Sequence, residues 1–558
     1  MISVLLSFGK SPEKSKSHAI VKSHTKTSTV TIKRFPFPQI EQLSQKDVAY
    51  ATKNPKLRPF YKYEANLASF GEVIADKAKD TINRAVLVEA LAAQYADLEV
   101  SAATRANIEV LAQETTFTVT TAHQPSLATG PLYYIYKIVS AIHLARLLKE
   151  TYPKNDFVPV FVTGGEDHDF EEVNHLNLFN KKIVWENEES GSVGMMKTAS
   201  LQGVLSELKD ILGDRDEAQA IYELLEKAYT GHDKYALATV DLVNRLFGEY
   251  GLVVLSMNNA ALKAEFVPIM KRELLEQPSQ DLINKATGEL EAAGFSGQAH
   301  AREINLFYLR DQIRERIVLE EGVYKVLNTD YVFSEEELIT ELETNPQHFS
   351  PNVVMRPLFQ ELILPNLAYI GGGGEIAYWL ERKEQFAHFG LNFPMLIRRN
   401  SVLWLDAGTK KRMAKLGLAT EDLFIETETL LKRFIRQNTE NELSLAEEKA
   451  QQTKVFDAIK YKAQEIDPTL AKAVAAEQVK QMNVLNQLEG RLMRAEKQKH
   501  ETALNQIRSL KDKLFPGNGL QERHDNFLGF YLKYGRQFFE VLLEHLNPLE
   551  EGFIIVEE

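Results

Sequence analysis

The sequence predicts an α/β protein with a parallel-sheet core and a C-terminal α-helical coiled coil. The β-branched run at 117–121 and the apolar run at 158–163 are both typical of buried strands. Between them, apolar residues from Ile135 to Ala145 recur with helical spacing. A strand, a helix and a second strand in this order form a βαβ unit, whose two strands are parallel. Residues 421–515 are rich in Ala, Glu, Lys, Gln and Leu, which favours long helices.

Four segments are expected along the chain. Residues 1–34 are basic and rich in Ser and Thr, and we expect a disordered basic tail, with a transit peptide as the alternative. Residues 35–420 are expected to form the sheet core, interrupted by an insert at about 186–345. Residues 421–515 are expected to form an antiparallel coiled coil, and residues 516–558 a C-terminal segment that packs on the core.

Local patterns predict further elements within these segments. In the core we expect strands at 182–185, 252–256 and 367–370, helices at 216–229 and 236–248, and β-hairpins over 298–328 with a turn at Glu321-Gly322. In the coiled coil, Leu485, Leu488 and Leu492 follow 3-4 spacing, and Asp467-Pro468 marks the bend between two helices. Since long amphipathic helices need a partner surface, self-association of two such hairpins is expected, with folding back onto the core as the alternative.

The composition excludes several classes of protein. The 558 residues carry a formal net charge of −13, so a general nucleic-acid binder is not expected. No apolar run approaches the roughly 20 residues that span a bilayer, so no integral membrane protein is expected. The chain has no cysteine, which excludes disulfides, thiolate metal sites and a cysteine nucleophile. Any chemistry therefore uses oxygen and nitrogen groups.

The first candidate cluster is the loop at 121–137, T-A-H-Q-P-S-L-A-T-G-P-L-Y-Y-I-Y-K. It lies between a predicted strand and a predicted helix and offers the imidazole of His123 with the hydroxyls of Ser126 and Thr129. The amides at a helix N-terminus favour an anion such as phosphate or carboxylate. The alternative is an ordinary capped loop.

The second cluster, at 164–175, is denser: G-G-E-D-H-D-F-E-E-V-N-H. His168, Glu171 or Glu172, and His175 would share one face if a helix started here. Such a set could bind a divalent cation, act as acid and base, or hold an amine substrate. The alternative is a solvated acidic helix start, which the helix dipole favours.

The third cluster, at 371–379, is G-G-G-G-E-I-A-Y-W. Glycines after a strand allow a ligand to approach the backbone closely, and Glu375 would suit an ammonium group. The alternative is a flexible connection followed by core aromatics. Standard motifs are missing: there is no G-x-x-x-x-G-K-[ST], no G-x-G-x-x-G after a strand, no H-E-x-x-H and no G-x-S-x-G.

Together the clusters resemble one family closely, the cysteine ligase of bacillithiol biosynthesis. The matching stretches are T-G-P-L-Y-Y-I-Y-K (129–137), G-E-D-H-D-F-E-E-V-N-H (165–175), R-P-L-F-Q-E-L-I-L-P (356–365), G-G-E-I-A-Y-W (373–379) and L-F-P-G-N-G-L-Q-E-R (514–523). The resemblance runs from about residue 35 to the C-terminus. It implies a Rossmann-like core similar to class I aminoacyl-tRNA synthetases, with connecting-peptide inserts and a dimerising coiled coil.

The resemblance also implies an activity. A cytoplasmic ligase of this family would join the carboxyl of L-cysteine to the amine of glucosaminyl malate, the last step of bacillithiol biosynthesis. Because a free carboxylate must be activated before it forms an amide, ATP is the expected co-substrate, with or without Mg, through an acyl-adenylate or an acyl-phosphate. No metal site is expected from the sequence. The rival interpretations are a nucleotide-dependent scaffold and a different ATP-dependent amide ligase.

Roles follow as hypotheses. The expected catalytic residues are His123 at the phosphates, and Asp167, His168 and Asp169 at the attacking amine. The expected substrate-binding residues are Ser126, Thr129, Tyr133, Glu166, Asn174, His175, Glu375, Tyr378, Arg398 and Arg399, the two arginines as carboxylate clamps. The expected nucleotide-binding residues are Gly372, Gly373, Gly374, Arg523 and Asn526. The acids at 166–172 are expected to make the site suit an amine.

Overall fold

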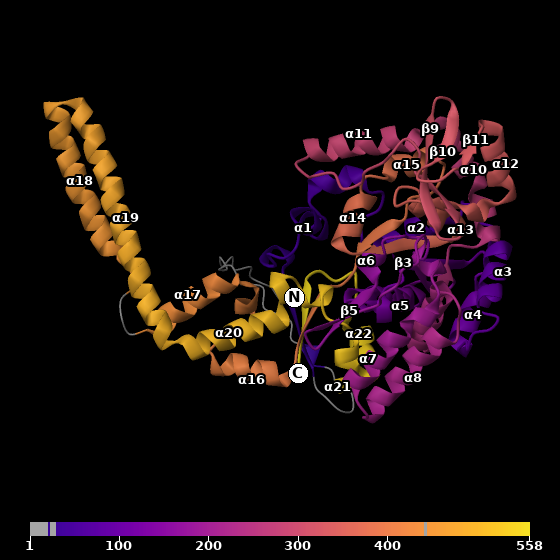
Figure 1. Ribbon diagram of the computed structural model, residues 1–558, viewed down its shortest axis with the longest axis horizontal. Helices are drawn as coiled ribbons and strands as arrows, with labels where there is room; N and C mark the ends of the chain where they lie inside the picture. The colour runs from indigo at the N-terminus through magenta and orange to yellow at the C-terminus, as the bar shows by residue number, and fades with distance from the viewer. Residues whose placement is uncertain (1–20, 23–29, 440–442) are drawn as a thin grey trace, which may run out of the picture. The chain divides into compact units, whose positions relative to one another are not determined.

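The computed structural model describes residues 21–22, 30–439 and 443–558, and it divides the chain into two compact units (Figure 1). The first unit comprises Met1–Trp404 and Gln521–Glu557, and the second Leu405–Leu520 with Glu558. Within the described ranges, no helix is both long and apolar enough to cross a bilayer.

A five-stranded parallel sheet forms the centre of the first unit. Its order is β14-β13-β3-β4-β7, and every neighbouring pair is parallel. The strands are β3 (Thr116–His123), β4 (Asp156–Thr163), β7 (Val253–Ser256), β13 (Asn366–Gly371) and β14 (Met395–Arg398). The first strand lies in the middle, with the next two on one side and the last two on the other. This is the Rossmann order, and the predicted α/β core is confirmed.

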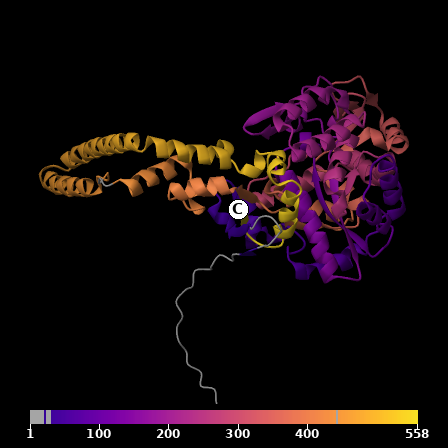
Figure 2. The ribbon, with the colours of Figure 1, turned by 90° about the horizontal axis from the view of Figure 1, so that it is seen from below.

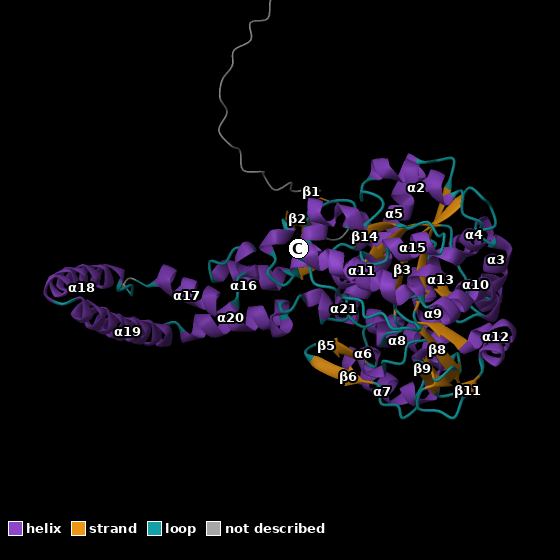
Figure 3. Ribbon diagram, turned by 90° about the horizontal axis from the view of Figure 1, so that it is seen from above, coloured by secondary structure: helices purple, strands orange, loops and turns teal. Residues whose placement is uncertain are grey.

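Both faces of this sheet are covered by helices (Figure 3). Seven of the eight residues of β3 and of β4 are buried, as near-continuous apolar or β-branched runs require. Helix α5 (Tyr133–Thr151) connects these two strands and packs on both, which makes the predicted βαβ unit. The other helices of the first unit are α1 (Gln45–Ala51), α2 (Phe70–Lys77), α3 (Arg84–Gln94), α4 (Ala102–Val110), α6 (Phe170–Val173), α7 (Gln202–Leu212), α8 (Asp216–Thr230), α9 (Tyr235–Phe247), α10 (Ala260–Glu276), α11 (Pro278–Ala292), α12 (Glu335–Thr344), α13 (Arg356–Ile363), α14 (Gly373–Trp379), α15 (Lys383–His388), α21 (Leu528–Tyr534) and α22 (Gln537–His545).

The range 186–345 is not one insert. Strand β7 lies inside it and pairs with β4, because Val253 and Val254 are fully buried and complete the edge of the parallel sheet. A separate antiparallel sheet follows, in the order β11-β10-β9-β8-β12. Its strands are β8 (Leu306–Arg310), β9 (Ile313–Glu320), β10 (Val323–Val326), β11 (Val332–Phe333) and β12 (Phe349–Pro351). The predicted hairpin with its turn at Glu321-Gly322 is β9–β10, and both turn residues have positive φ, 53° and 82°.

Two small sheets complete the first unit. Strands β5 (His175–Leu178) and β6 (Lys181–Val184) form a hairpin. Strands β1 (Val21–Lys22), β2 (Thr31–Phe35), β16 (Phe553–Glu557) and β15 (Val402–Leu405) form a sheet in that order. The expected tail at 1–34 lies largely outside the described residues, but 31–34 belong to β2, because Ile32 and Phe35 are buried against the C-terminal strand.

The second unit is helical. Its helices are α16 (Ala407–Lys415), α17 (Thr427–Asn438), α18 (Ala446–Ile466), α19 (Pro468–Lys499) and α20 (Glu501–Leu514). Helices α18 and α19 lie side by side as an antiparallel pair (Figure 2), with Lys449 Nζ 2.6 Å from the Glu489 carboxylate. The predicted bend is confirmed: the Asp467 side chain accepts a hydrogen bond from Thr469 N, and Pro468 begins α19.

Candidate active site

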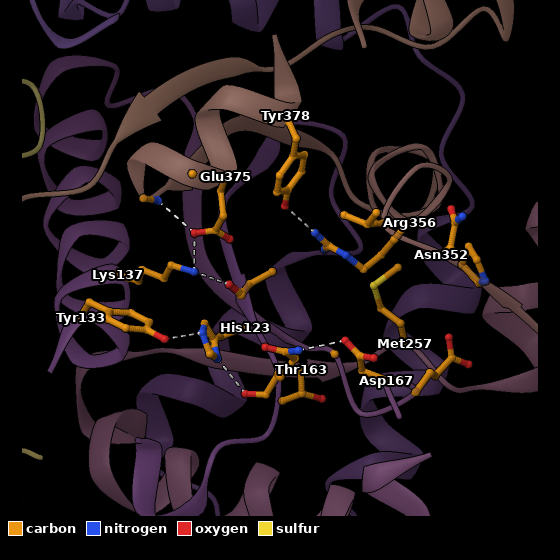
Figure 4. A pocket seen from close by; sticks show the side chains of 18 of the residues that line it. His123, Tyr133, Lys137, Thr163, Asp167, Met257, Asn352, Arg356, Glu375 and Tyr378 are labelled. Atoms are coloured by element: carbon orange, nitrogen blue, oxygen red, sulfur yellow. Dashed lines mark hydrogen bonds and ion pairs between the residues drawn. The ribbon is translucent and has the colours of Figure 1, made fainter. Parts of the chain in front are cut away.

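A cavity of about 430 Å³ opens at the carboxyl ends of the parallel strands (Figure 4). The loops after β3, β4 and β13 line it, together with residues from β9 and from the start of α13. The strand order reverses between β3 and β13, so these two loops diverge and leave a crevice. All three predicted clusters meet in this cavity.

His123 ends β3 and is held as a neutral imidazole. Burial, and after it the charge of Lys137, lower the pKa of His123 to about 4. Nδ1 lies 3.0 Å from the Gln124 carbonyl and Nε2 lies 3.2 Å from the Tyr133 hydroxyl. A carbonyl only accepts, so these partners assign the proton to Nδ1 and make Nε2 the acceptor from Tyr133. In this form His123 orients Tyr133 and has no proton at Nε2 to donate to a phosphate.

Lys137, which is buried, and Glu375, which is partly exposed, form an ion pair across the crevice. Lys137 lies on α5, its side chain is 2% exposed, and its Nζ lies 2.5 Å from Glu375 Oε2 and donates to the Ala122 carbonyl. Glu375 also accepts from Gly372 N and from the Tyr369 hydroxyl. Burial alone would raise the pKa of Glu375, but these partners lower it to about 2. Glu375 is therefore ionised and fully engaged by the protein.

Asp167 is the most exposed acid of the cavity, at 36% of its side chain, against 22% for Glu375 and 12% for Glu166. It accepts from Gln124 Nε2 at 2.9 Å and from His168 N at 2.7 Å, and Arg314 Nη1 lies 3.8 Å away. Burial opposes ionisation, but the charge of Arg314 and these hydrogen bonds lower the pKa of Asp167 overall. Asp167 is thus a carboxylate that solvent or a substrate can reach.

Glu166 is tied to elements that come later in the chain. It forms an ion pair with Lys263, whose side chain is fully buried on α10, and accepts from Ser350 Oγ on β12 at 3.1 Å. Its carboxylate is therefore balanced inside the protein, so Glu166 fixes the loop after β4 more than it offers charge to a ligand.

The glycine loop and the two arginines have structural partners. A Cβ on Gly373 would lie 2.2 Å from the Asp47 carboxyl carbon, so this glycine makes room for Asp47. Arg398 holds the same carboxylate with Nε at 2.6 Å and Nη2 at 2.9 Å, and it does not line the cavity. Arg399 does line it, with Nη2 2.8 Å from Glu522 Oε1.

The loop at 126–130 is braced by the C-terminal segment. Asn526 Nδ2 donates to the carbonyls of Ala128 and Gly130 at 2.9 and 2.6 Å. Thr129 is buried with a φ of 66°, a left-handed conformation that such bracing can hold. Asn526 therefore positions this loop from behind.

The structure brings together about half of the predicted site residues. Those that line the cavity are His123, Tyr133, Glu166, Asp167, Gly372, Gly374, Glu375, Tyr378, Arg399 and Arg523. Those that do not are Ser126, Thr129, His168, Asp169, Gly373, Asn174, His175, Arg398 and Asn526. The shared helix face considered for His168 and His175 does not form, because the only helix here is the single turn α6 and His175 begins β5. Asp169 is its N-cap, and His168 contacts Arg314 Nη1 with Nδ1 at 2.5 Å.

The sequence interpretation missed three cations, Lys137, Arg314 and Arg356. Lys137 had a signal, since it lies between the fully buried Tyr136 and Ile138 in a helix, where an unpaired lysine is costly. Arg356 had a signal as the first residue of the matching stretch at 356–365, but no role was assigned to it. Arg314 had none, because a charged residue in a β-hairpin is ordinary.

The charge of the cavity differs from the sequence expectation. The expected acid-rich site is instead cation-rich: the lining carries Lys137, Arg314, Arg356, Arg399 and Arg523 against Glu166, Asp167 and Glu375. Among the described residues, no group of three or more His, Asp or Glu side chains is arranged to hold a metal ion.

Comparisons with known proteins agree on one family. Residues 31–400 match the model of the bacillithiol biosynthesis BshC N-terminal Rossmann-like domain, and residues 402–558 match the BshC C-terminal coiled-coil domain. A Flavobacterium psychrophilum protein named "Putative cysteine ligase BshC" is 42% identical over 91% of this chain and 96% of its own length. A Bacillus cytotoxicus protein of the same name is 30% identical over 88% of this chain and 94% of its own length.

A crystal structure titled as a putative arginyl-tRNA synthetase from Campylobacter jejuni covers 83% of this chain and 97% of its own at 11% identity. Its TM-score is 0.23, which is too low to carry an argument. The specific likeness to class I synthetases therefore stays a prediction.

Proposed function

The chain belongs to the bacillithiol biosynthesis BshC family, and on that premise we propose that it is a ligase that joins L-cysteine to the amine of glucosaminyl malate. ATP is the proposed co-substrate. The observation that carries the proposal is the meeting of the loops after β3, β4 and β13 in one cavity at the reversal of strand order. The proposed substrates are metabolites of the cytoplasm, which is the proposed location.

The proposed reaction has two steps. A carboxylate oxygen of cysteine attacks a phosphorus atom of ATP and expels pyrophosphate or ADP. The amine nitrogen then attacks the activated carbonyl carbon, forms the C–N bond and expels AMP or phosphate, which keeps one carboxyl oxygen. The amine must be neutral before it attacks, and its nitrogen loses one further proton as the amide forms.

The described contacts suggest how the residues divide this work. Asp167 is the ionised and accessible acid, so we assign it to orient the amine and accept its proton. The cations of the lining suit the carboxylates of both substrates and the phosphates of ATP. Lys137 and Glu375 hold the two sides of the crevice, which is a positioning role.

We also propose that the chain self-associates through the hairpin of α18 and α19. Apolar side chains remain exposed along it, including Val479 at 61%, Leu488 at 41% and Leu492 at 42%. Leu488→Glu with Leu492→Glu should convert a dimer to a monomer in analytical ultracentrifugation. Monomeric wild-type protein at micromolar concentration would contradict this.

The test of the proposed function is a reconstituted ligation. Purified protein is incubated with L-cysteine, glucosaminyl malate and MgATP, and the amide product and the nucleotide are followed by mass spectrometry. Product that depends on all three substrates supports the proposal. Nucleotide binding without turnover would favour a scaffold, and turnover with a different amine a different amide ligase.

A further inference from the structure

Two cations of the cavity have no counter-ion among the described residues, Arg523, which is exposed to solvent, and Arg356, which is half-buried. Arg356 begins α13 and lines the cavity, and its Nη2 donates to the Tyr378 hydroxyl at 3.1 Å (Figure 4). Its Nη1 is buried and has no hydrogen-bond partner among the described residues. No described carboxylate lies within ion-pair distance of this guanidinium, and the nearby Glu375 is taken by Lys137.

The Glu375 carboxylate favours the charged form of Arg356 through its charge, but no described carboxylate is bonded to the guanidinium. Burial raises the pKa of both Tyr369 and Tyr378, so these phenols stay protonated and uncharged. A second buried guanidinium, that of Arg382, lies 5.3 Å over the Tyr378 ring and adds positive charge. Arg382 does not line the cavity, so Arg356 is the one of the two that a ligand can reach.

Two other arginines of this cavity, Arg399 and Arg314, differ from Arg356 in having a carboxylate nearby, although the Nε of each is also buried without a hydrogen-bond partner among the described residues. Arg399 is paired with Glu522 at 2.8 Å, and Arg314 contacts His168 and faces Asp167. An uncompensated charge in a partly dry site is costly, and a bound anion removes that cost. A guanidinium presents a planar fork of donors that matches a carboxylate or a phosphate.

We propose that Arg356 is the centre of an oxyanion subsite, which binds a carboxylate or phosphate group of a substrate beside the Tyr378 hydroxyl. The proposed function determines only which substrate carries the oxyanion, and the subsite itself does not depend on it. The sources are the malyl carboxylates, the cysteine carboxylate and a nucleotide phosphate, and binding itself requires no turnover.

The test is calorimetric titration of the full-length protein with three probes in separate arms: L-malate, L-cysteine and inorganic pyrophosphate. We expect at least one probe to bind the wild type, and Arg356→Gln to weaken that binding at least tenfold. Arg356→Lys, which keeps the charge and loses the fork, should weaken it by a smaller factor. The probe that binds identifies the source of the oxyanion. The matched control is Arg105→Gln, since Arg105 is exposed on α4 and the same charge is removed.

Two results would overturn the subsite: no probe binds the wild type, or Arg356→Gln and Arg356→Lys both bind as the wild type does. Circular dichroism checks that each variant folds, and Arg356→Lys carries the test if Arg356→Gln does not. Ligation by the purified protein, with probe binding that does not depend on Arg356, would reject the subsite alone. Arg356-dependent binding without ligation would reject the proposed function alone.

Discussion

Lys137 and Arg356 are two cations that line the same cavity, and the protein treats them in opposite ways. Lys137 is matched by Glu375 and by a carbonyl, while Arg356 has a neutral phenol as its partner. The pair at Lys137 connects α5 to the first turn of α14, on the other side of the crevice. A buried charge with a complete set of partners, such as Lys137, stabilises the folded protein. A charge without such partners, such as Arg356, is available to bind a ligand.

The largest expected effect on stability comes from breaking the ion pair of Lys137 and Glu375. Lys137→Met leaves the Glu375 carboxylate, which is 22% exposed, without its cation, although the hydrogen bonds from Gly372 N and the Tyr369 hydroxyl remain. We expect the change to lower the free energy of unfolding by about 3 kcal/mol, the low end of the range for a broken buried pair. Lys137→Met with Glu375→Gln should recover most of that loss. Urea denaturation measures both. The control is Lys149→Met on the same helix, whose exposed ion pair with Asp156 should contribute about 0–1 kcal/mol. A Lys137→Met loss no greater than the control's would contradict the comparison.

Asp167 is an intermediate case, since it has partners and yet remains accessible. If it accepts the proton of the amine, Asp167→Asn should lower kcat by about 10²–10⁴-fold with a small change in stability. Steady-state ligation kinetics check this. The matched control is Glu172→Gln, because Glu172 shares the Gln124 Nε2 donor with Asp167 at the same distance, 2.9 Å. Equal kinetic effects of the two changes would remove the assignment of Asp167.

His123 should make the stability of the folded protein sensitive to acid. Its pKa is lowered to about 4 in the folded protein and is about 6.5 when unfolded, so the unfolded chain binds more protons between these values. Stability should therefore fall as the pH drops from about 6.5 towards 4, by about 1–3 kcal/mol from this group. His123→Gln should flatten that part of the curve in urea titrations at several pH values. An unchanged slope would show that other groups cause the decline.

The smallest expected effect on stability comes from replacing Arg356. Arg356→Gln removes a charge that has no counter-ion, so its cost should stay below about 1 kcal/mol, and it can be stabilising. The unfolding midpoint in urea measures it, next to that of Lys137→Met. A loss of about 3 kcal/mol or more would mean that Arg356 is held by the fold as Lys137 is.

Much of the fold was predictable because the strands carry strong local signals. The runs at 117–121 and 158–163 are buried strands, and the turn at Glu321-Gly322 and the bend at Asp467-Pro468 are where their residue types demand. The local pattern predicts a strand at 252–256, which is β7, but the expected insert at 186–345 includes it. The pairing of β7 with β4 was not predictable, since strands that are far apart in the sequence leave no local pattern of their pairing.

The candidate site was most predictable at the ends of strands. His123, Asp167 and Glu375 follow β3, β4 and β13, and the topology brings them together. The pairing of charges was not predictable. Arg398 and Arg399 are adjacent in the sequence, yet Arg398, the last residue of β14, binds Asp47, and Arg399, just after the strand, binds Glu522.

The most direct test of the central claim follows the carboxyl oxygen of cysteine. With L-cysteine labelled with ¹⁸O in its carboxyl group, glucosaminyl malate and MgATP, the account predicts one ¹⁸O atom in AMP or in phosphate for every amide formed. Label in AMP would mean an acyl-adenylate, and label in phosphate an acyl-phosphate. Amide without transferred label, or no amide from the purified protein, would contradict the account.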